Sequence, residues 1–190
     1  MIPPRPTELA HAILRDFVRP GSLAVDATAG NGHDTLFLAK SIGPDGRVIA
    51  YDIQPAALES TREKLESAGL AERVTLLHRS HVELAEDVRE GSAAIVMFNL
   101  GYLPGQDHVT TTEECETLVA LEAAETALCP GGVLSVVCYP GHPGGDAEAE
   151  AVEAKLRGLA RHCSWRVARY GMLETKSPAP FLLVARKPGG

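Results

Sequence analysis

The apolar residues of this 190-residue chain alternate between two spacings, and this alternation constrains its fold. Short continuous apolar runs predict strands over residues 22–27, 47–53, 73–78, 93–98 and 133–139. Helical spacing predicts helices over residues 7–18, 34–41, 55–69, 82–88 and 146–161, and one from about 112 to a stop at 130–132. Alternating strands and helices favour an α/β fold, a parallel sheet with helices on both faces.

Two further runs, residues 165–173 and 181–186, predict a closing hairpin. The sheet is then seven-stranded and mostly parallel, with its last strand antiparallel. Neither a linker nor a repeat interrupts residues 1–190, so we expect a single domain. Ligands of such sheets bind beyond the carboxyl ends of the strands.

Composition excludes several classes of protein. The four cysteines form no Cys-x-x-Cys pair, which disfavours a zinc site or a disulfide framework and favours reduced thiols in a cytoplasm. No apolar run reaches the roughly 20 residues that span a bilayer, and the first residues lack an apolar signal core. We therefore expect a cytoplasmic protein with no metal and no membrane contact.

A glycine turn follows the first predicted strand, which ends at Asp26. No third glycine completes a dinucleotide fingerprint, and Asp34 at the helix start would repel a pyrophosphate. A cationic cofactor without phosphate, S-adenosylmethionine, suits the turn better, with Asp26 near its ammonium group. The predicted contacts here are Asp26, Thr28, Gly30, Asn31, Gly32, Asp34 and Thr35.

Asp52 ends the second predicted strand, 20 residues after Gly32. A carboxylate there can accept both ribose hydroxyls of an adenosine. Ile53 and Gln54 are expected to cover the adenine. Ser80 and His81, after the third strand, are expected at its edge.

A long loop after the fourth predicted strand begins with Asn99, which is also expected to touch the cofactor at its methyl end. Loops of this length are usually functional. The Asn99 amide oxygen and the Leu100 carbonyl can orient the N–H groups of an amine, and Tyr102 can stack on a base. The predicted substrate contacts in this loop are Leu100, Gly101, Tyr102, Pro104, Gly105 and Asp107.

Tyr139 and His142 follow the fifth predicted strand. His142 can take a proton from an amine that enters as ammonium, so we count Asn99, Tyr102 and His142 as candidate catalytic residues and Tyr139 as a substrate contact. No group of other candidate functional residues accompanies His11, His78, His108 or His162 in the sequence.

Charge is unevenly distributed along the chain. The net charge is −7, yet residues 151–190 hold eight basic and two acidic side chains. This segment is either a solvated surface or a phosphate-binding one.

These motifs resemble one family over residues 5–187: the small stand-alone class I (Rossmann-like) methyltransferases long labelled rRNA methylases. The resemblance implies an S-adenosylmethionine-dependent enzyme of tRNA modification that methylates the aminomethyl group of 5-aminomethyl-2-thiouridine at the wobble position, and so a tRNA partner bound at its anticodon region. Two departures stand out. Gln106 and His108 replace a Gly and a Lys of the family pattern, and Pro140 replaces a histidine.

Two alternatives remain open at this point. One is a methyltransferase of the same fold that acts on rRNA or on a small amine. The other is a non-catalytic RNA-binding module, which the intact loop at Asn99 disfavours. An exposed sheet edge could also pair two chains into a homodimer.

Overall fold

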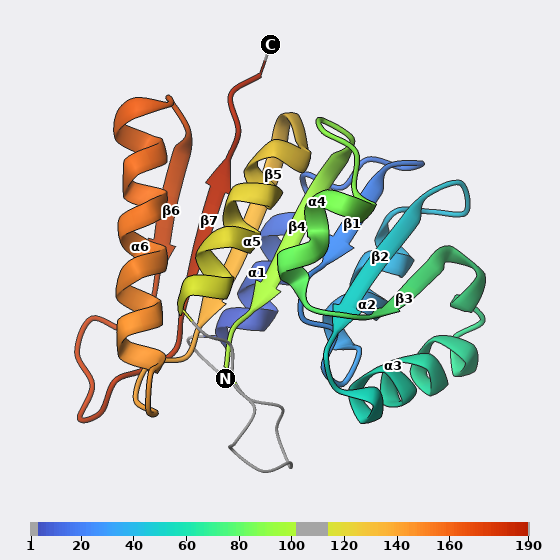
Figure 1. Cartoon of the computed structure of the whole chain (residues 1–190), viewed down its shortest axis with the longest axis horizontal. Coiled ribbons are helices and arrows are strands. Elements are labelled where there is room, and N and C mark those ends of the chain that lie inside the picture. Colours follow the sequence, from blue (N-terminus) through green and yellow to red (C-terminus); the bar gives the residue numbers. More distant parts are fainter. Residues whose placement is uncertain (1–3, 102–113, 190) are drawn as a thin grey trace.

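A single seven-stranded sheet forms the centre of the computed structural model, which describes residues 4–101 and 114–189 (Figure 1). The strand order is β3-β2-β1-β4-β5-β7-β6, and β7 alone runs against its neighbours. This is the predicted α/β architecture with its antiparallel last strand. The strands are β1 (Leu23–Asp26), β2 (Arg47–Asp52), β3 (Val74–His78), β4 (Ala93–Asn99), β5 (Leu128–Cys138), β6 (Arg166–Tyr170) and β7 (Phe181–Arg186).

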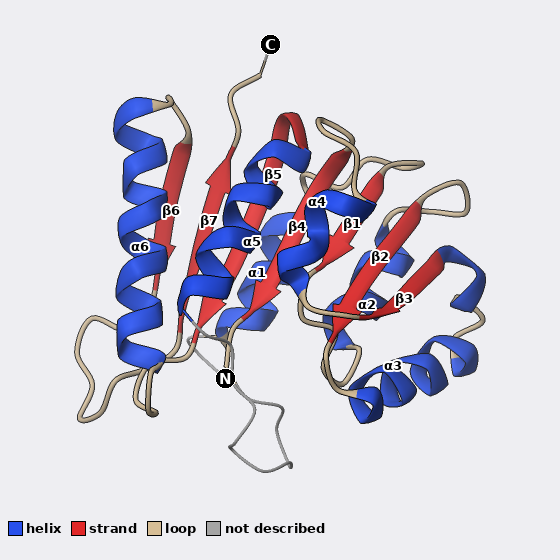
Figure 2. Cartoon of the chain, in the orientation of Figure 1, coloured by secondary structure: helices blue, strands red, loops and turns tan. Residues whose placement is uncertain are grey.

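Helices cover both faces of this sheet (Figure 2). The first three helices pack against one face and the last three against the other. A second 3-10 turn, η2 (His81–Glu83), leads into the fourth helix, and η1 (Ala71–Arg73) precedes β3. The helices are α1 (Pro6–Leu14), α2 (His33–Ser41), α3 (Pro55–Ser67), α4 (Leu84–Asp87), α5 (Glu114–Ala127) and α6 (Gly145–His162).

The core is divided between the two faces because alternate side chains of each strand point to opposite sides. Val96 and Phe98 of β4 join the cluster under α5 and α6, whereas Ile95 and Met97 join the cluster under α1 and α2. All four are at most 1% exposed. Burial on both sides explains why the sequence shows a continuous apolar run at β4 rather than an alternation.

The prediction for β5 was wrong at its start. We expected a helix to stop at residues 130–132 and a strand to begin at Val133, but the strand begins at Leu128. Leu128 pairs with Ala93, and pairing resumes at Val133 opposite Ile95. The intervening residues bulge from the ladder, and Gly131 adopts a φ of +76° there. The Pro-Gly-Gly sequence at residues 130–132 does interrupt regular structure, as predicted. The interruption lies within β5, however, and not between a helix and a strand.

The termini of other elements differ by a few residues. Helix α1 ends at Leu14 rather than Val18, and β6 ends at Tyr170 rather than Leu173.

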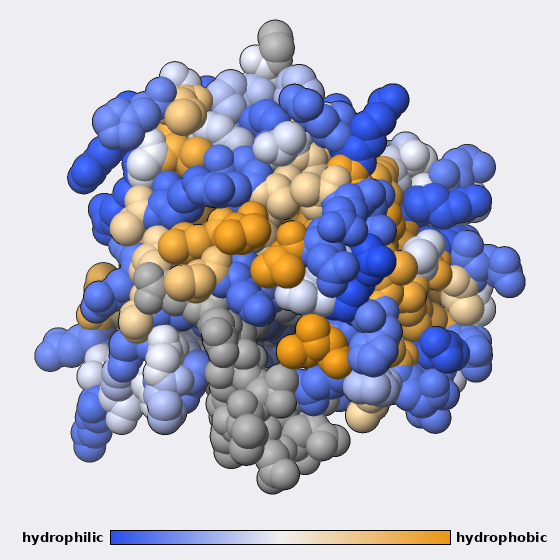
Figure 3. Space-filling model, viewed as in Figure 1, coloured by the Kyte–Doolittle hydropathy of each residue, from blue (hydrophilic) through white to orange (hydrophobic). Residues whose placement is uncertain are grey.

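Apolar side chains reach the surface over α5 on the face shown in Figure 3, and Val119 of α5 is 53% exposed. No helix in the described ranges is long and apolar enough to cross a membrane.

Candidate active site

A cavity of about 280 Å³ lies at the carboxyl edge of the sheet. Loops after β1, β2, β3, β4 and β5 all contribute to its wall, as expected at this edge of a parallel sheet. Ten residues predicted to bind the cofactor line it. They are Thr28, Gly30, Asn31, Asp34, Asp52, Ile53, Gln54, Ser80, His81 and Asn99. Leu100, Gly101 and Tyr139, predicted to bind substrate, also line it.

The turn between β1 and α2 is built on Gly32. This residue has a φ of +75°, and a Cβ there would lie 2.9 Å from the Thr61 backbone of α3. Glycine alone meets both requirements without strain. The Thr61 hydroxyl also donates to the Gly30 carbonyl over 3.0 Å, which fixes the turn against α3.

Asp26 supports this turn from the core of the protein and is not part of the cavity wall. Its side chain is fully buried. One oxygen accepts from the Thr28 amide over 3.1 Å and the other from the Thr35 hydroxyl over 2.5 Å. Burial, and next the Asp34 carboxylate, raise the pKa of Asp26 to about 7. Asp26, Gly32 and Thr35 are not among the lining residues and shape the turn instead, and their contact with the cofactor stays a prediction.

Asp52 joins the first two loops. Its Oδ2 accepts from the Gly30 amide over 2.8 Å, and its Oδ1 accepts from the Gln54 amide over 2.9 Å. A carboxylate oxygen has capacity for more than one hydrogen bond, so Asp52 can still accept from a ligand. His78, expected to stand alone, contacts the Ile53 carbonyl through Nε2 over 3.0 Å.

His81 presents a bare ring nitrogen in the cavity wall. Its Nδ1 donates to the Ala27 carbonyl over 3.1 Å, and burial lowers the pKa of the ring, which is therefore neutral. Nε2 then carries no hydrogen and can only accept. It is buried and has no hydrogen-bond partner within the described residues. A buried acceptor without a partner is costly, so this nitrogen suits a ligand N–H group.

Asn99 lies where β4 ends, and hydrogen bonds to Thr28 and Asp34 hold it. Its backbone amide donates to the Thr28 hydroxyl over 2.7 Å, and its Nδ2 donates to Asp34 Oδ2 over 3.4 Å. Its Oδ1 is buried without a hydrogen-bond partner in the part of the chain described. Burial and the Asp34 charge raise the pKa of Tyr139, and a hydrogen bond with the Asn99 side chain only partly opposes them, so the phenol stays protonated at neutral pH.

His142 does not line the cavity. Its ring lies against Gly145 at the start of α6, and its Nδ1 contacts the Pro143 carbonyl over 3.1 Å. Its role as a proton acceptor stays a prediction. Tyr102, Pro104, Gly105 and Asp107, with His108, lie outside the described residues.

The charge of the cavity wall favours a cationic ligand. Asp34, Asp52 and Glu116 are carboxylates, while Arg79 is engaged by Asp87 over 3.1 Å. Four polar residues of the cavity wall were not predicted from the sequence. Tyr51 and Arg79 lie at strand ends next to predicted contacts, and His33 follows the glycine turn, so position could have found them. Glu116 comes from α5 and had no local signal.

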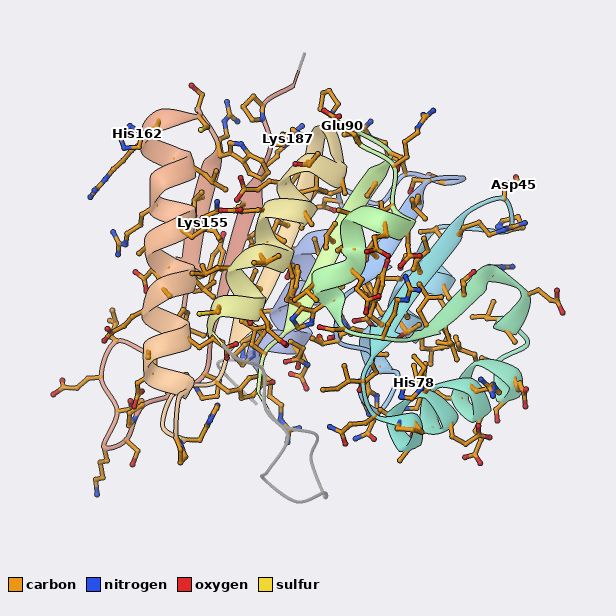
Figure 4. All side chains as sticks on the ribbon, in the orientation of Figure 1. Asp45, His78, Glu90, Lys155, His162 and Lys187 are labelled. Carbon is orange, nitrogen blue, oxygen red and sulfur yellow. The ribbon has the colours of Figure 1, made fainter. Side chains whose placement is uncertain are left out.

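The basic C-terminal segment is spread over both edges of the sheet. Arg186 pairs with Val133 at the edge opposite the cavity, where Lys187 and His162 also lie (Figure 4). Lys187 donates to the carbonyls of Glu125 and Leu128 over 2.7 Å each. The connection from β6 to β7, which holds Lys176, lies at the cavity edge because Phe181 pairs with Cys138.

The fold and this cavity define a class I methyltransferase, an enzyme that uses S-adenosylmethionine. Residues 48–186 match the family described as "Putative rRNA methylase". The chain belongs to that family, as its motifs predicted.

Individual relatives agree with this assignment. The chain is 42% identical over 186 residues to the Arabidopsis thaliana protein named "tRNA (mnm(5)s(2)U34)-methyltransferase, chloroplastic", covering 93% of this chain and 67% of that protein. The crystal structure of a Clostridium thermocellum protein described as a "putative rRNA-methylase" matches 98% of this chain and all of its own, at 36% identity and a TM-score of 0.92. A Streptococcus mutans protein described as a "putative methyltransferase", solved in complex with SAH, matches 98% of this chain and 99% of its own, at 36% identity and a TM-score of 0.86.

Proposed function

We propose that this chain transfers a methyl group from S-adenosylmethionine to the aminomethyl group of a 5-aminomethyl-(2-thio)uridine at the wobble position of tRNA. The observation that carries the proposal is the buried Asn99 Oδ1, an acceptor without a hydrogen-bond partner among residues 4–101 and 114–189. An amine N–H group is a ligand that satisfies such an atom. The name of the 42%-identical Arabidopsis relative supports the choice of acceptor.

The cavity fits S-adenosylmethionine. Its carboxylates suit a sulfonium and an ammonium group, and Asp52 can accept from ribose hydroxyls. The bare Nε2 of His81 is matched to the exocyclic amino group of adenine, which donates hydrogen bonds. Thr28, Gly30, Asn31, Ile53, Gln54 and Ser80 would complete the surroundings.

The chain's own residues orient the acceptor amine. When bound, the cofactor supplies an electrophilic methyl group. Asn99 Oδ1 and the Leu100 carbonyl accept hydrogen bonds from the two N–H groups of the amine. These bonds orient the nitrogen lone pair toward the methyl group. The protonated Tyr139 phenol lies in the same wall and can donate to the nucleotide. Tyr102 would stack on the base, and His142 would receive a proton from an incoming ammonium group.

We propose that the RNA is held at its anticodon region across the carboxyl edge of the sheet. Residues 1–190 would act as one domain, in a cytoplasm where its four cysteines stay reduced. A homodimer formed through the exposed edge strand β6 is part of the same proposal.

The deciding experiment incubates the chain with labelled S-adenosylmethionine and tRNA from a strain that lacks the enzyme. Nucleoside mass spectrometry should then show conversion of the aminomethyl nucleoside to its methylaminomethyl form. Label in rRNA nucleosides or in a free amine would favour the alternative acceptors instead. Cofactor binding without transfer to any of them would favour a non-catalytic RNA-binding module.

A further inference from the structure

We propose that His11 is a positioning residue for methyl transfer, because it holds the Asp34 carboxylate that in turn sets the orientation of the Asn99 amide. This inference rests on the proposed role of Asn99 as the amine acceptor. The three residues come from α1, the first turn of α2 and the end of β4. They form a chain of hydrogen bonds that runs from the surface to the cavity wall.

His11 is fixed in both position and direction. Its ring stacks on Phe37 of α2, with the ring centres 4.1 Å apart and the planes 6° from parallel. Its Nε2 lies 2.5 Å from Asp34 Oδ1. A carboxylate oxygen only accepts, so Nε2 carries the hydrogen and donates it. The stack prevents the ring from turning away, and one oxygen of Asp34 is therefore committed to His11.

The second oxygen of Asp34 then contributes, together with the Tyr139 side chain that also hydrogen-bonds Asn99, to which way the Asn99 amide faces. The side-chain nitrogen and oxygen of an asparagine have nearly the same shape and can exchange places by rotation about χ2. Asp34 Oδ2 accepts, so it selects the orientation in which Nδ2 faces it, at 3.4 Å. The Asn99 backbone is anchored separately by its bond to Thr28. Oδ1 is thereby left in the orientation that an amine requires.

His11 acts through Asp34 and not on the ligand. It is not part of the cavity wall, and its side chain is 22% exposed. Asp34, by contrast, is 7% exposed at its side chain and lines the cavity. A change at His11 should therefore lower turnover while leaving most cofactor contacts in place.

The test compares two substitutions that separate packing from hydrogen bonding. His11→Phe keeps a flat ring on Phe37 but removes the donor to Asp34. His11→Gln gives up the stack but keeps a side-chain N–H donor. We expect His11→Phe to lower kcat about tenfold, within the range that misplaced groups cost, with little change in cofactor affinity. His11→Gln should retain more activity. Equal losses in the two variants would overturn the inference.

A double-mutant cycle adds a readout that a purely structural role would not move. If His11 acts through Asn99, His11→Phe should cause no further loss in an Asn99→Ala background. Losses that multiply in the double variant would show that His11 acts elsewhere. His162→Phe, the same exchange at the exposed end of α6 (Figure 4), should leave kcat unchanged.

A measurement without substrate separates this inference from the proposed function. The side-chain NH₂ signals of Asn99 can be assigned in a ¹⁵N spectrum by their absence from Asn99→Ala. They should shift or broaden in His11→Phe and stay in place in His162→Phe. Unchanged Asn99 signals in His11→Phe would overturn the positioning role. Failure of the wild-type chain to methylate tRNA would instead overturn the proposed function, whatever these spectra show.

Discussion

The Gly30 amide donates a hydrogen bond of 2.8 Å to the Asp52 carboxylate, and this bond joins the glycine turn after β1 to the end of β2. The same carboxylate accepts from the Gln54 amide, so it organises two loops of the cavity before any ligand binds. Sites whose groups are held in place in advance lose less entropy on binding. Asp52 is thus both a structural residue and a candidate ribose contact.

Asp52→Ala should weaken S-adenosylmethionine binding by about 1–3 kcal/mol, as expected for the loss of a charged hydrogen-bond acceptor. Titration calorimetry measures this directly. Asp45→Ala, in the exposed turn before β2 (Figure 4), is the matched control and should bind normally. Unchanged affinity in Asp52→Ala would remove this residue from the site.

Asn99→Ala should lower the rate of methyl transfer about 10²-fold or more, because the reaction depends on the position of the amine. Cofactor affinity should fall far less. Single-turnover methylation of undermodified tRNA, at saturating cofactor, isolates the transfer step. Near-normal rates would show that the acceptor amine is held by other residues.

Asp26 should make stability depend on pH. Its pKa rises from an ordinary value of 3.8 to about 7 in the folded chain, so folding favours the protonated form. The stability that this proton contributes is fully present below about pH 4 and is lost as the pH rises through about 7.

Urea unfolding of Asp26→Asn, across the same pH range, tests this. The substitution keeps the side chain neutral at every pH. The free energy of unfolding of the variant should therefore rise, relative to that of the wild type, as the pH rises. Asp16→Asn, at an exposed position after α1, is the control for the exchange of Asp for Asn itself. A difference between wild type and Asp26→Asn that does not vary with pH would contradict the assignment.

His81 should stay neutral at pH values where exposed histidines are charged. Burial lowers its pKa from 6.5, and the Ala27 carbonyl only partly opposes this. A ¹⁵N spectrum should therefore show protonated Nδ1 and bare Nε2. The bare nitrogen should shift when S-adenosylmethionine is added. His81→Phe should bind the cofactor more weakly, and equal affinity would exclude His81 from adenine recognition.

Lys176→Glu should weaken RNA binding and reduce the slope of log affinity against log salt by roughly one phosphate contact. Lys176 is exposed in the connection at the cavity edge. Arg161→Glu is the comparison, since Arg161 lies in the last turn of α6, toward the opposite edge. Equal effects of the two variants would mean that RNA contacts the basic segment along its whole length.

Much of the cavity could be predicted because strand ends in a parallel sheet meet at one edge. Asp52, His81 and Asn99 are far apart in the chain, yet each follows a clear apolar run, and the topology alone brings them together. No side-chain detail was needed for this step. The strands themselves were visible because most of them are buried on both faces.

What could not be predicted depends on the direction of individual side chains. Asp26 ends β1 as expected, but it points into the core and meets Thr35. His11 was predicted to stand alone, and it contacts Asp34, 23 residues away, because α1 packs beside α2. Such a pairing has no signature in the spacing of the sequence. The start of β5 before its break was hidden for a similar reason, since only Ala93 on the neighbouring strand shows that Leu128 belongs to the ladder.

The antiparallel course of β7 has a practical consequence for handling this protein. The strand starts beside Cys138 and ends beside Val133, so it carries the chain away from the cavity and leaves the C-terminal end at the far side of the molecule (Figure 1). Helix α1 starts at the near side, with Arg5 close enough to influence Tyr139. An affinity tag or fluorophore attached after Gly189 would leave the path of a bulky nucleic acid clear, whereas one placed before Pro6 would obstruct it.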